Sequence, residues 1–367
     1  MSQIKLKHSG GNGVIIAAPS SNPASDRTLT LPSDADGTVV SKDSSNNVAD
    51  IVSINGNPLG GSKNLVINGN MKVAQRGTSA TAVGTGYRTA DRFYLRRTVA
   101  NTTFNSSVAN GVLTMNNPSA STAFDVRHGV EWDDIFYGKT MTISFNATAA
   151  VGNVDLTVEV VDGSVGSTTA QVSAHLTGTT TDVQDLAVSP VSGTRYEVTV
   201  DMPADGDVSF TPDMIRLRFG TVGSDASQSF TLSKVQFEFG SVATEFEFEP
   251  YETTLRRCLR YYYKHVHQTG SEGLAVFNAA NYNNTNAYAV LTFPVPMRTA
   301  PSLDQVTGTN YYRGYGNGGN DNFNEFIIAK QHVNAAELIF TNDKGQGNAL
   351  WVRTLAAGAY LALDAEL

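Results

Sequence analysis

Two tyrosine- and asparagine-rich stretches near the C-terminus carry the side chains best suited to bind a ligand. Residues 310–324 read NYYRGYGNGGNDNFN, and residues 281–288 read NYNNTNAY. Tyrosine rings stack on sugar rings, asparagine, aspartate and arginine hydrogen-bond hydroxyl groups, and loops on a rigid scaffold build recognition surfaces from such residues. We therefore expect a receptor-binding surface formed by Tyr311, Tyr312, Arg313, Tyr315, Asn317, Asp321, Phe323, Tyr282 and Tyr288. The alternative is that both stretches are hairpin turns whose tyrosines pack on their own module or on a neighbouring subunit.

A group of acidic residues around Trp132 is the best candidate for catalysis. Glu131, Asp133 and Asp134 could serve as the acid and base of a glycosidase, with Trp132 stacked on the sugar. These residues also form a polar turn next to a strand, and adjacent side chains of an extended chain point to opposite faces. We expect the turn to be structural and the protein not to be an enzyme.

No stretch of the sequence completes a metal site. The turns at 34–37, 205–207 and 342–345 contain carboxylate or amide oxygens but lack the full ligand set of a calcium loop. His265 and His267 are spaced by one residue and could bind a metal ion by combining several chains of an oligomer. A solvated helix end is the favoured interpretation of these histidines, and we expect no cofactor.

The composition argues against several classes of protein. The 367-residue chain carries a net charge of −8, whereas non-specific nucleic-acid binding requires basic patches. No apolar run approaches the length of a membrane span, and no apolar segment follows Lys5 and Lys7 as it would in a signal peptide. Cys258 is the single cysteine, so no intramolecular disulfide can form, and we expect it to be a core residue.

Short alternating apolar runs predict a β-rich protein. The clearest runs are 141–145, 154–160, 196–200 and 215–219. Such alternation is the pattern of strands with one buried face, and turn residues separate the runs, so we expect an antiparallel two-sheet sandwich. The apolar phase changes between Phe230–Leu232 and Val235–Phe239, which predicts a β-bulge near Ser233–Lys234.

One helix is predicted where Pro250 opens a different pattern. The apolar residues at helical spacing are Tyr251, Leu255, Cys258, Leu259 and Tyr262. Proline suits a first helical turn, and Glu252 near the start and Lys264 near the end complement the helix dipole. We expect a linking helix over 250–266, with its arginines on the outer face.

The first 62 residues lack the means to fold alone. The first aromatic residue of the protein is Tyr87, and the apolar residues before it are scattered between turns. Such short strands bury too little surface to offset a backbone entropy cost of about 1–2 kcal/mol per residue. This segment is either a flexible arm or a set of strands completed by other copies or by a docking partner. The extended runs Val14–Ala18 and Thr28–Pro32 favour the second alternative.

Four motifs, in order, resemble segments of tail-fibre and appendage proteins of tailed bacteriophages. The first comprises AAPSSNP at 17–23, RTLTLP at 27–32 and DGTV at 36–39. The second comprises NLVINGN at 64–70, QRGTS at 75–79, YRTADRF at 87–93 and GKTMTISF at 138–145. The third joins FEP at 248–250 to LRRCLRYYY at 255–263, and the fourth is FPVPMR at 293–298. Together they span most of the chain, which makes the set more specific than any single motif.

Four positions depart from the family pattern. Phe93 stands where tryptophan is usual, His128–Gly129 replaces a usual Gln-Arg pair, and Asn146 stands where an aromatic residue is usual. A pocket that the family builds from those side chains is therefore not carried over to this chain.

The resemblance implies a mainly β fold in four parts. These are an N-terminal short-stranded attachment and oligomerisation segment (1–62), a jelly-roll β-sandwich (63–249), one linking α-helix (250–266) and a C-terminal β-sandwich-like distal module (267–367). Related sugar-binding modules hold a structural calcium ion, so the resemblance allows one here, although the sequence does not identify its ligands.

The resemblance also implies a virion structural protein, assembled in the host cytoplasm as a homotrimer. Residues 1–62 would contact other tail or capsid proteins, and the rest would contact a host surface glycan or lipopolysaccharide, with no nucleic-acid partner and no membrane insertion. The first alternative is a purely architectural spike or connector without receptor binding. The second is a glycan depolymerase, which is disfavoured because no coil repeat of a parallel β-helix is visible.

Overall fold

A computed structural model shows a chain built from antiparallel sheets. The structure describes residues 3–7, 13–17, 53–54, 57–58, 62–97, 104–116, 124–149, 154–166, 171–173, 184–186, 195–221, 229–271, 273–317 and 319–367. The chain divides into a small unit, Met1–Ile54, and a large unit, Asn55–Leu367. Each unit is described by itself.

The described residues of the small unit include an antiparallel hairpin. Strand β1 (Gln3–Lys7) pairs with β2 (Gly13–Ala17), and β3 (Ser53–Ile54) is a two-residue strand. The predicted extended run Val14–Ala18 is therefore confirmed over most of its length. The run Thr28–Pro32 and most of the first motif lie outside the described residues.

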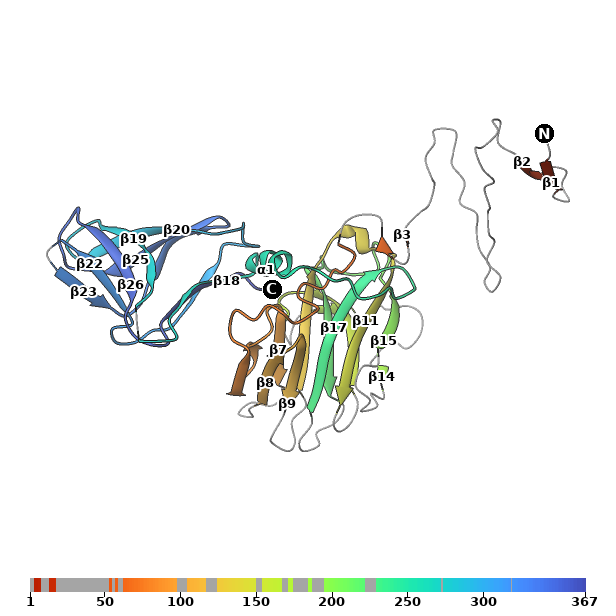
Figure 1. Cartoon of the computed structure of the whole chain (residues 1–367), viewed down its shortest axis with the longest axis horizontal. Coiled ribbons are helices and arrows are strands. Elements are labelled where there is room, and N and C mark those ends of the chain that lie inside the picture. The colour runs from red at the N-terminus through yellow and green to blue at the C-terminus, as the bar shows by residue number, and fades with distance from the viewer. Residues whose placement is uncertain are drawn as a thin grey trace, which may run out of the picture. The chain divides into compact units, whose positions relative to one another are not determined.

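The first part of the large unit is a sandwich of two antiparallel sheets (Figure 1). One sheet has the order β13-β12-β16-β10-β7-β6, with β14 also paired to β12, and the other has the order β15-β11-β17-β9-β8-β5. The strands of the first sheet are β6 (Gly86–Tyr87), β7 (Phe93–Arg97), β10 (Phe124–Glu131), β12 (Val154–Asp162), β13 (Gln171–Ser173), β14 (Gln184–Leu186) and β16 (Met214–Thr221). Those of the second are β5 (Ser79–Val83), β8 (Phe104–Ala109), β9 (Val112–Asn116), β11 (Thr140–Ala149), β15 (Arg195–Asp201) and β17 (Ser229–Phe239). A short 3₁₀ turn, η1 (Asp134–Phe136), and the short strand β4 (Asn57–Pro58) complete this part. The mainly β, jelly-roll sandwich fold is thus confirmed.

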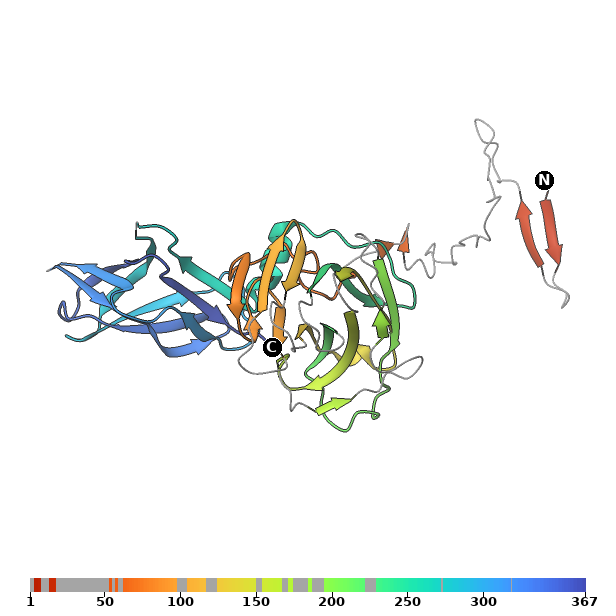
Figure 2. The same ribbon diagram turned by 90° about the horizontal axis from the view of Figure 1, so that it is seen from below.

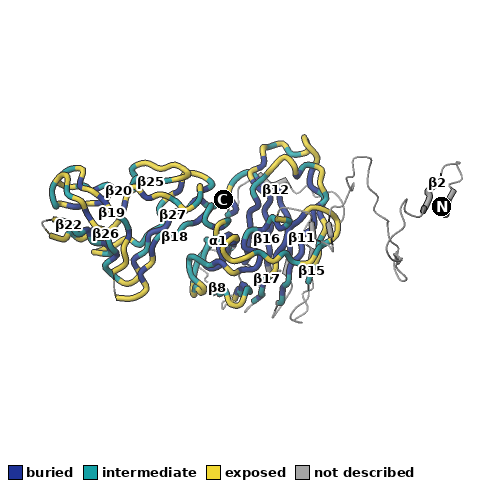
Figure 3. Tube along the Cα trace, turned by 45° about the horizontal axis from the view of Figure 1, so that its top comes forward, coloured by how far each residue is buried: buried dark blue, intermediate teal, exposed yellow. Residues whose placement is uncertain are grey.

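The alternation of the strands places the core between the two sheets. Met141, Ile143 and Phe145 of β11 are fully buried, as are Val235 and Phe237 of β17. Figure 3 shows the buried stretches in dark blue along β11, β16 and β17. The apolar side chains thus lie on one face of each sheet, as their period of two requires.

The predicted β-bulge is confirmed in β17. Ser144 and Asn146 of β11 are two residues apart, whereas their partners Gln236 and Ser233 are three apart, so β17 carries one extra residue. Lys234 in this bulge has a φ of 51°. The extra residue reverses the side-chain phase and lets both halves of β17 face the same core.

The NLVINGN motif forms a turn that locks against this bulge. Asn64 donates to the Val235 carbonyl over 3.0 Å and accepts from the Phe237 amide over 3.2 Å. Gly69 packs so closely on the same carbonyl that a Cβ would lie 2.0 Å from it. Only glycine fits such a close backbone approach.

The linking helix is shorter than predicted. Helix α1 covers Tyr251–Leu259, and the chain then becomes strand β18 (Tyr262–His267). The prediction of a helix to residue 266 is therefore wrong: β18 pairs with the last strand of the chain, and this non-local pairing outweighs the helical spacing of the apolar residues. The buried face of α1 consists of Thr254 and Cys258, while Tyr251 is exposed. Cys258 is thus a core residue, as predicted.

The C-terminal module consists of two further sheets, whose strands run from teal to dark blue along the chain in Figure 2. The three-stranded sheet has the order β18-β27-β21, and the seven-stranded sheet the order β23-β22-β26-β19-β20-β25-β24. Their remaining strands are β19 (Ala275–Asn281), β20 (Asn286–Thr292), β21 (Ser302–Gln305), β22 (Tyr312–Gly316), β23 (Gly319–Phe323), β24 (Ile327–His332), β25 (Ala335–Thr341), β26 (Ala349–Thr354) and β27 (Tyr360–Asp364). A core of Leu338, Phe340, Val352, Leu361 and other apolar residues joins them. Among the described residues, no helix has the length and apolarity to cross a membrane.

Candidate functional site

An exposed tryptophan marks the outer face of the seven-stranded sheet. Trp351 in β26 is 47% exposed, whereas its neighbours Leu350 and Val352 are buried. Tyr315 of β22 is its cross-strand partner, and the two ring centroids lie 6.4 Å apart. Two large rings are thus held side by side on a rigid sheet, with one face of the sheet open to solvent.

Two arginines support these rings. The Arg353 guanidinium lies 3.6 Å from the centroid of the Trp351 ring and 5.5 Å from that of Tyr315. Arg313 lies 5.8 Å from the Tyr315 centroid and donates to Asn322 over 2.6 Å. A guanidinium group over a ring face restricts the movement of the ring. Its N–H groups at the edge of the ring remain available as hydrogen-bond donors. We call Arg313, Tyr315, Trp351 and Arg353 the aromatic platform.

A shallow groove lies in the same sheet face beside the platform. It has a volume of about 280 Å³ and is lined by Asn278, Ala279, Ala280, Tyr288, Ala289, Val290 and Glu337. Asn278 of β19 is the cross-strand partner of Trp351, and Ala280 is the partner of Tyr288. Tyr288 packs edge-to-face against Tyr282, with the ring centroids 5.3 Å apart. Small residues thus leave space between aromatic groups, and amide and carboxylate groups border that space.

The structure brings part of the predicted receptor-binding set to this face. Arg313 and Tyr315 belong to the platform, and Tyr282 and Tyr288 lie at the groove. Asn317 is exposed after β22. Asp321 in β23 accepts a hydrogen bond from the Asp343 amide over 3.0 Å, so one of its oxygens serves the local fold.

Two predicted residues are corrected by their burial. Tyr312 is 0% exposed and Phe323 is 4% exposed, and both belong to the module core. The Tyr312 hydroxyl donates to the Tyr360 carbonyl over 2.6 Å. Tyr311 is partly buried and packs on the same core. Tyr312 and Phe323 thus pack within the module, and Tyr311 does so in part.

Sequence reasoning missed the centre of the site. Trp351, Arg353 and Asn278 were not among the predicted residues. The signal was available in the pattern Leu350-Trp351-Val352-Arg353-Thr354, which alternates in a strand and places Trp351 and Arg353 on the same face. Tryptophan is among the residues that are enriched at binding surfaces.

The acidic turn around Trp132 is occupied by structural contacts. Glu131 accepts from the Tyr261 hydroxyl over 2.6 Å and pairs with Arg260 over 3.1 Å. Burial opposes the ionised form of Glu131, but these two donors outweigh burial and lower its pKa. Asp133 caps η1 by accepting from the Ile135 amide over 3.0 Å. A carboxyl group with a lowered pKa is poorly suited to act as a general acid at neutral pH.

His265 and His267 lie on strand β18 and not at a helix end. The His265 ring nitrogens contact the Tyr263 hydroxyl at 2.7 Å and the Val276 carbonyl at 2.7 Å, so both are in use. In the part of the chain that the structure describes, no group of three or more His, Cys, Asp or Glu residues could hold a metal ion.

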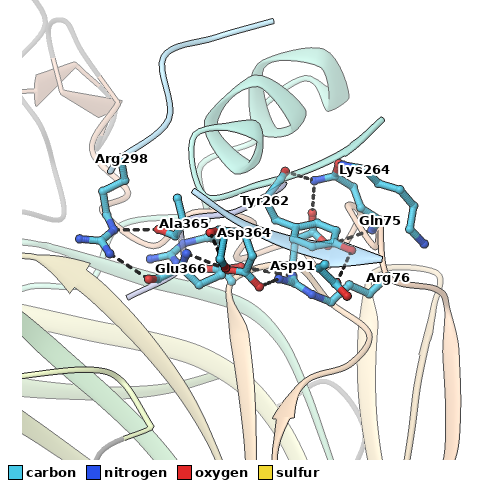
Figure 4. Close-up of polar contacts among 12 residues, drawn as sticks. Gln75, Arg76, Asp91, Tyr262, Lys264, Arg298, Asp364, Ala365 and Glu366 are labelled. Atoms are coloured by element: carbon cyan, nitrogen blue, oxygen red, sulfur yellow. Dashed lines mark hydrogen bonds and ion pairs between the residues drawn. The ribbon is translucent and has the colours of Figure 1, made fainter. Parts of the chain in front are cut away.

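The motif residues of the sandwich meet the helix–strand junction in a buried polar network (Figure 4). Gln75 donates to Asp91 over 2.6 Å and to the Tyr262 carbonyl over 2.8 Å, and it accepts from the Lys264 amide over 3.2 Å. Burial raises the pKa of Asp91 to about 6, although Arg76 and Gln75 favour its ionised form. One glutamine side chain therefore links the sandwich to the first strand of the C-terminal module.

Two arginines of the same motifs hold the last residues of the chain. Arg76 pairs with Asp364 over 3.0 Å and with Glu366 over 3.3 Å, and its guanidinium lies 3.4 Å from the Tyr262 ring centroid. Arg92 is fully buried, pairs with Glu366 and donates to the Gly129 carbonyl over 2.8 Å. It also lies 3.5 Å from the ring centroid of Tyr261.

The third and fourth motifs join the same network. Arg298 donates to the carbonyls of Ala365 and Glu366, both over 2.9 Å. Arg257 of α1 pairs with Glu249 over 3.0 Å and donates to the Asn64 carbonyl over 3.2 Å. Arg257 thus packs against the sandwich, and Arg298 holds the last residues of the chain, so these motif residues lie at the junction of the two modules.

The departure at His128 predicts a sensitivity to acid. His128 is fully buried, its Nε2 lies 3.1 Å from the Ile67 carbonyl, and burial followed by the nearby Arg92 holds its pKa well below its usual range. The neutral ring is therefore the folded form. In the unfolded chain a histidine has a pKa of about 6.5. Above that pH the contribution of His128 to the free energy of unfolding is complete, and below it the free energy of unfolding falls by about 1.4 kcal/mol per pH unit.

Replacing His128 with glutamine is expected to remove this loss. The glutamine amide can donate to the same carbonyl and does not titrate. Denaturant unfolding of both proteins between pH 7.5 and pH 5 should show the wild type losing stability relative to His128→Gln only below about pH 6.5. A difference between the two proteins that is independent of pH would contradict the assignment.

Comparison with known proteins yields solved structures of low similarity. No family model matches the chain, and no curated protein matches it. A CBM4 structure shares 14% identity over 48% of this chain and 99% of its own, with a TM-score of 0.31. The CBM22-1 xylan-binding domain of Paenibacillus barcinonensis Xyn10C shares 13% identity over 45% of this chain and 94% of its own, with a TM-score of 0.24. The xyloglucanase domain of Sinorhizobium fredii NopAA, in complex with cellobiose, shares 12% identity over 44% of this chain and 98% of its own, with a TM-score of 0.26. At these values the likeness carries no inference about ligands.

Proposed function

We propose that the protein is a structural appendage of a phage virion that attaches to host surface glycan through the aromatic platform. The observation that carries the proposal is Trp351, a large exposed ring on a rigid sheet that is supported by Arg353 at 3.6 Å. Stacking a sugar ring on Trp351 and Tyr315 would bury apolar surface, and the guanidinium groups would donate to sugar hydroxyls. The role is adhesion, and no reaction is proposed.

The virion role is supported by the four sequence motifs that resemble phage appendage proteins. Attachment by such proteins relies on many weak sites. A single glycan site of about millimolar affinity supplies only about −4 kcal/mol. Several sites on one oligomer, and several oligomers on one particle, raise the effective affinity by about 10²–10⁴ through avidity. A homotrimer that docks to other virion proteins through residues 1–62 would supply that multivalency.

Two measurements on the full chain test this proposal. Multi-angle light scattering should give three times the chain mass of 39.1 kDa. An array of bacterial lipopolysaccharides and capsular polysaccharides should show saturable binding to at least one glycan. A monomeric mass would contradict the proposed trimer. An array on which no glycan binds would contradict the proposed attachment role.

A second candidate is a purely architectural appendage. It is favoured by the position of the motif residues, because Gln75, Arg76, Arg92 and Arg298 all serve the junction of the two modules. The resemblance to phage appendage proteins thus concerns residues of this junction and none of the aromatic platform. If the protein binds no glycan and fails to compete with phage for host cells, while its deletion blocks particle assembly, the architectural role is correct.

A further inference from the structure

A second cleft lies where the three-stranded sheet faces the edge of the sandwich. It has a volume of about 560 Å³. One wall comes from the three-stranded sheet and includes Tyr262, Lys264 and Tyr360, and the other comes from the sandwich and includes Arg88 and Tyr94. The cleft is therefore separate from the aromatic platform on the seven-stranded sheet.

The carboxylates of this cleft are already satisfied. Asp304 accepts from the Tyr262 hydroxyl over 2.9 Å and from the Tyr360 hydroxyl over 2.8 Å. Asp364 pairs with Arg76 over 3.0 Å. These contacts fix the two tyrosine rings in place, so the aromatic lining of the cleft is organised before any ligand arrives.

Two cations of the lining have no such partner. The Lys264 ammonium lies 5.4 Å from the centroid of the Tyr360 ring, and Arg88 donates to the carbonyls of Gly84 and Thr85 over 3.2 and 2.8 Å. Within the described residues, neither cation forms an ion pair with a carboxylate. Lys264 is half-buried, and this burial lowers its pKa, although the carboxylates of Asp304 and Asp91 favour the charged ammonium. A bound anion would compensate both cations.

One further polar group of the lining is unsatisfied. The Tyr87 hydroxyl is buried and has no hydrogen-bond partner in the described part of the chain. A buried hydroxyl without a partner costs free energy that a ligand or water oxygen could recover. The cleft thus combines ring faces, two cations without a direct ion pair among the described residues, and an unused hydroxyl.

We propose that this cleft is a second saccharide site that takes a carboxylate-bearing sugar such as a uronic acid unit. The sugar carboxylate would pair with Lys264 and Arg88, and the sugar ring would pack against Tyr94 and Tyr360. The proposal rests on glycan binding as the function but uses none of the platform residues. A protein with both sites would prefer acidic surface polysaccharides to neutral ones, because the cleft supplies charge and the platform supplies stacking.

The test uses a pair of probes that share the sugar chain and differ in whether the carboxyl group carries a charge. Binding of oligogalacturonate and of its methyl ester to the full chain is measured by isothermal titration calorimetry at low salt. The wild type should bind the acid at least about tenfold more tightly than the ester, since one charge-assisted contact is worth that factor. Lys264→Gln should lose this tenfold preference, and Arg88→Gln should reduce it.

The controls separate this proposal from the platform. Trp351→Ala should retain the preference for the acid within about twofold, and circular dichroism should show that Lys264→Gln remains folded. Equal binding of acid and ester by the wild type, no binding of the acid, or an unchanged preference in Lys264→Gln would each overturn the acidic site. If the aromatic platform does not bind glycan, Trp351→Ala should instead bind the glycan array as the wild type does.

Discussion

Replacing Arg92 with methionine is expected to lower the free energy of unfolding of the large unit by about 3–5 kcal/mol. This is the typical cost of removing one partner of a buried ion pair. Arg92 is fully buried, and its loss would leave the Glu366 carboxylate with Arg76 alone and the Gly129 carbonyl without this donor. It would also remove the cation from the Tyr261 ring face. Methionine fills similar space without a charge, so the cost arises from the lost polar contacts.

Urea unfolding followed by intrinsic fluorescence measures this loss. Arg256→Met is the matched control, because Arg256 is exposed on α1 and should change stability by less than about 0.5 kcal/mol. The double variant Arg92→Met/Glu366→Gln should recover part of the loss, since the buried carboxylate is then uncharged. Equal effects of Arg92→Met and Arg256→Met would show that the junction does not depend on the buried pair.

Replacing Trp351 with alanine is expected to weaken glycan binding by about 30-fold or more while leaving the fold intact. Truncating a central aromatic anchor typically costs about 2 kcal/mol or more, which corresponds to that factor. Trp351 is 47% exposed and its neighbours in β26 form the core, so the strand keeps its buried residues. On a multivalent surface the loss would be larger, because each site contributes to avidity.

The measurement is the apparent dissociation constant for the best glycan from the array, determined with immobilised polysaccharide. Ile327→Ala is the matched control, because Ile327 is a large apolar residue that is 58% exposed on the edge strand β24. It should bind as the wild type does. If both variants bind equally well, the glycan lies elsewhere on the protein.

The strands could be predicted because their information is local. Met141, Ile143 and Phe145 alternate with polar residues, and this period alone identifies a strand with one buried face. The bulge at Lys234 followed from the change of apolar phase. Both features depend on neighbouring residues, so the sequence contains them directly.

The end of the helix could not be predicted in the same way. Tyr262 has helical spacing from Cys258, but its place in β18 depends on pairing with Asp364, about a hundred residues away along the chain. The network that fixes this pairing joins Gln75 and Arg76 to the last residues. Such distant partners leave no local pattern.

The binding surface was partly predictable for a related reason. Tyr312 and Tyr315 belong to one strand but point to opposite faces, so the first is buried and the second is on the platform. The glycine and asparagine residues around them predict a loop, and the side chains of a loop do not alternate between two faces. The alternation of 350–354 places Trp351 and Arg353 on one face of a strand, but only the sheet order brings Trp351 beside Tyr315.

The fluorescence of Trp351 tests most directly whether a sugar ring stacks on that residue. Trp132 and Trp351 are the two tryptophans of the protein, so the variant Trp132→Phe leaves Trp351 as the single reporter. Titration of this variant with the best glycan from the array should change the Trp351 emission saturably, with the same dissociation constant as binding to immobilised polysaccharide. Saturable binding with no change in Trp351 emission would contradict the account.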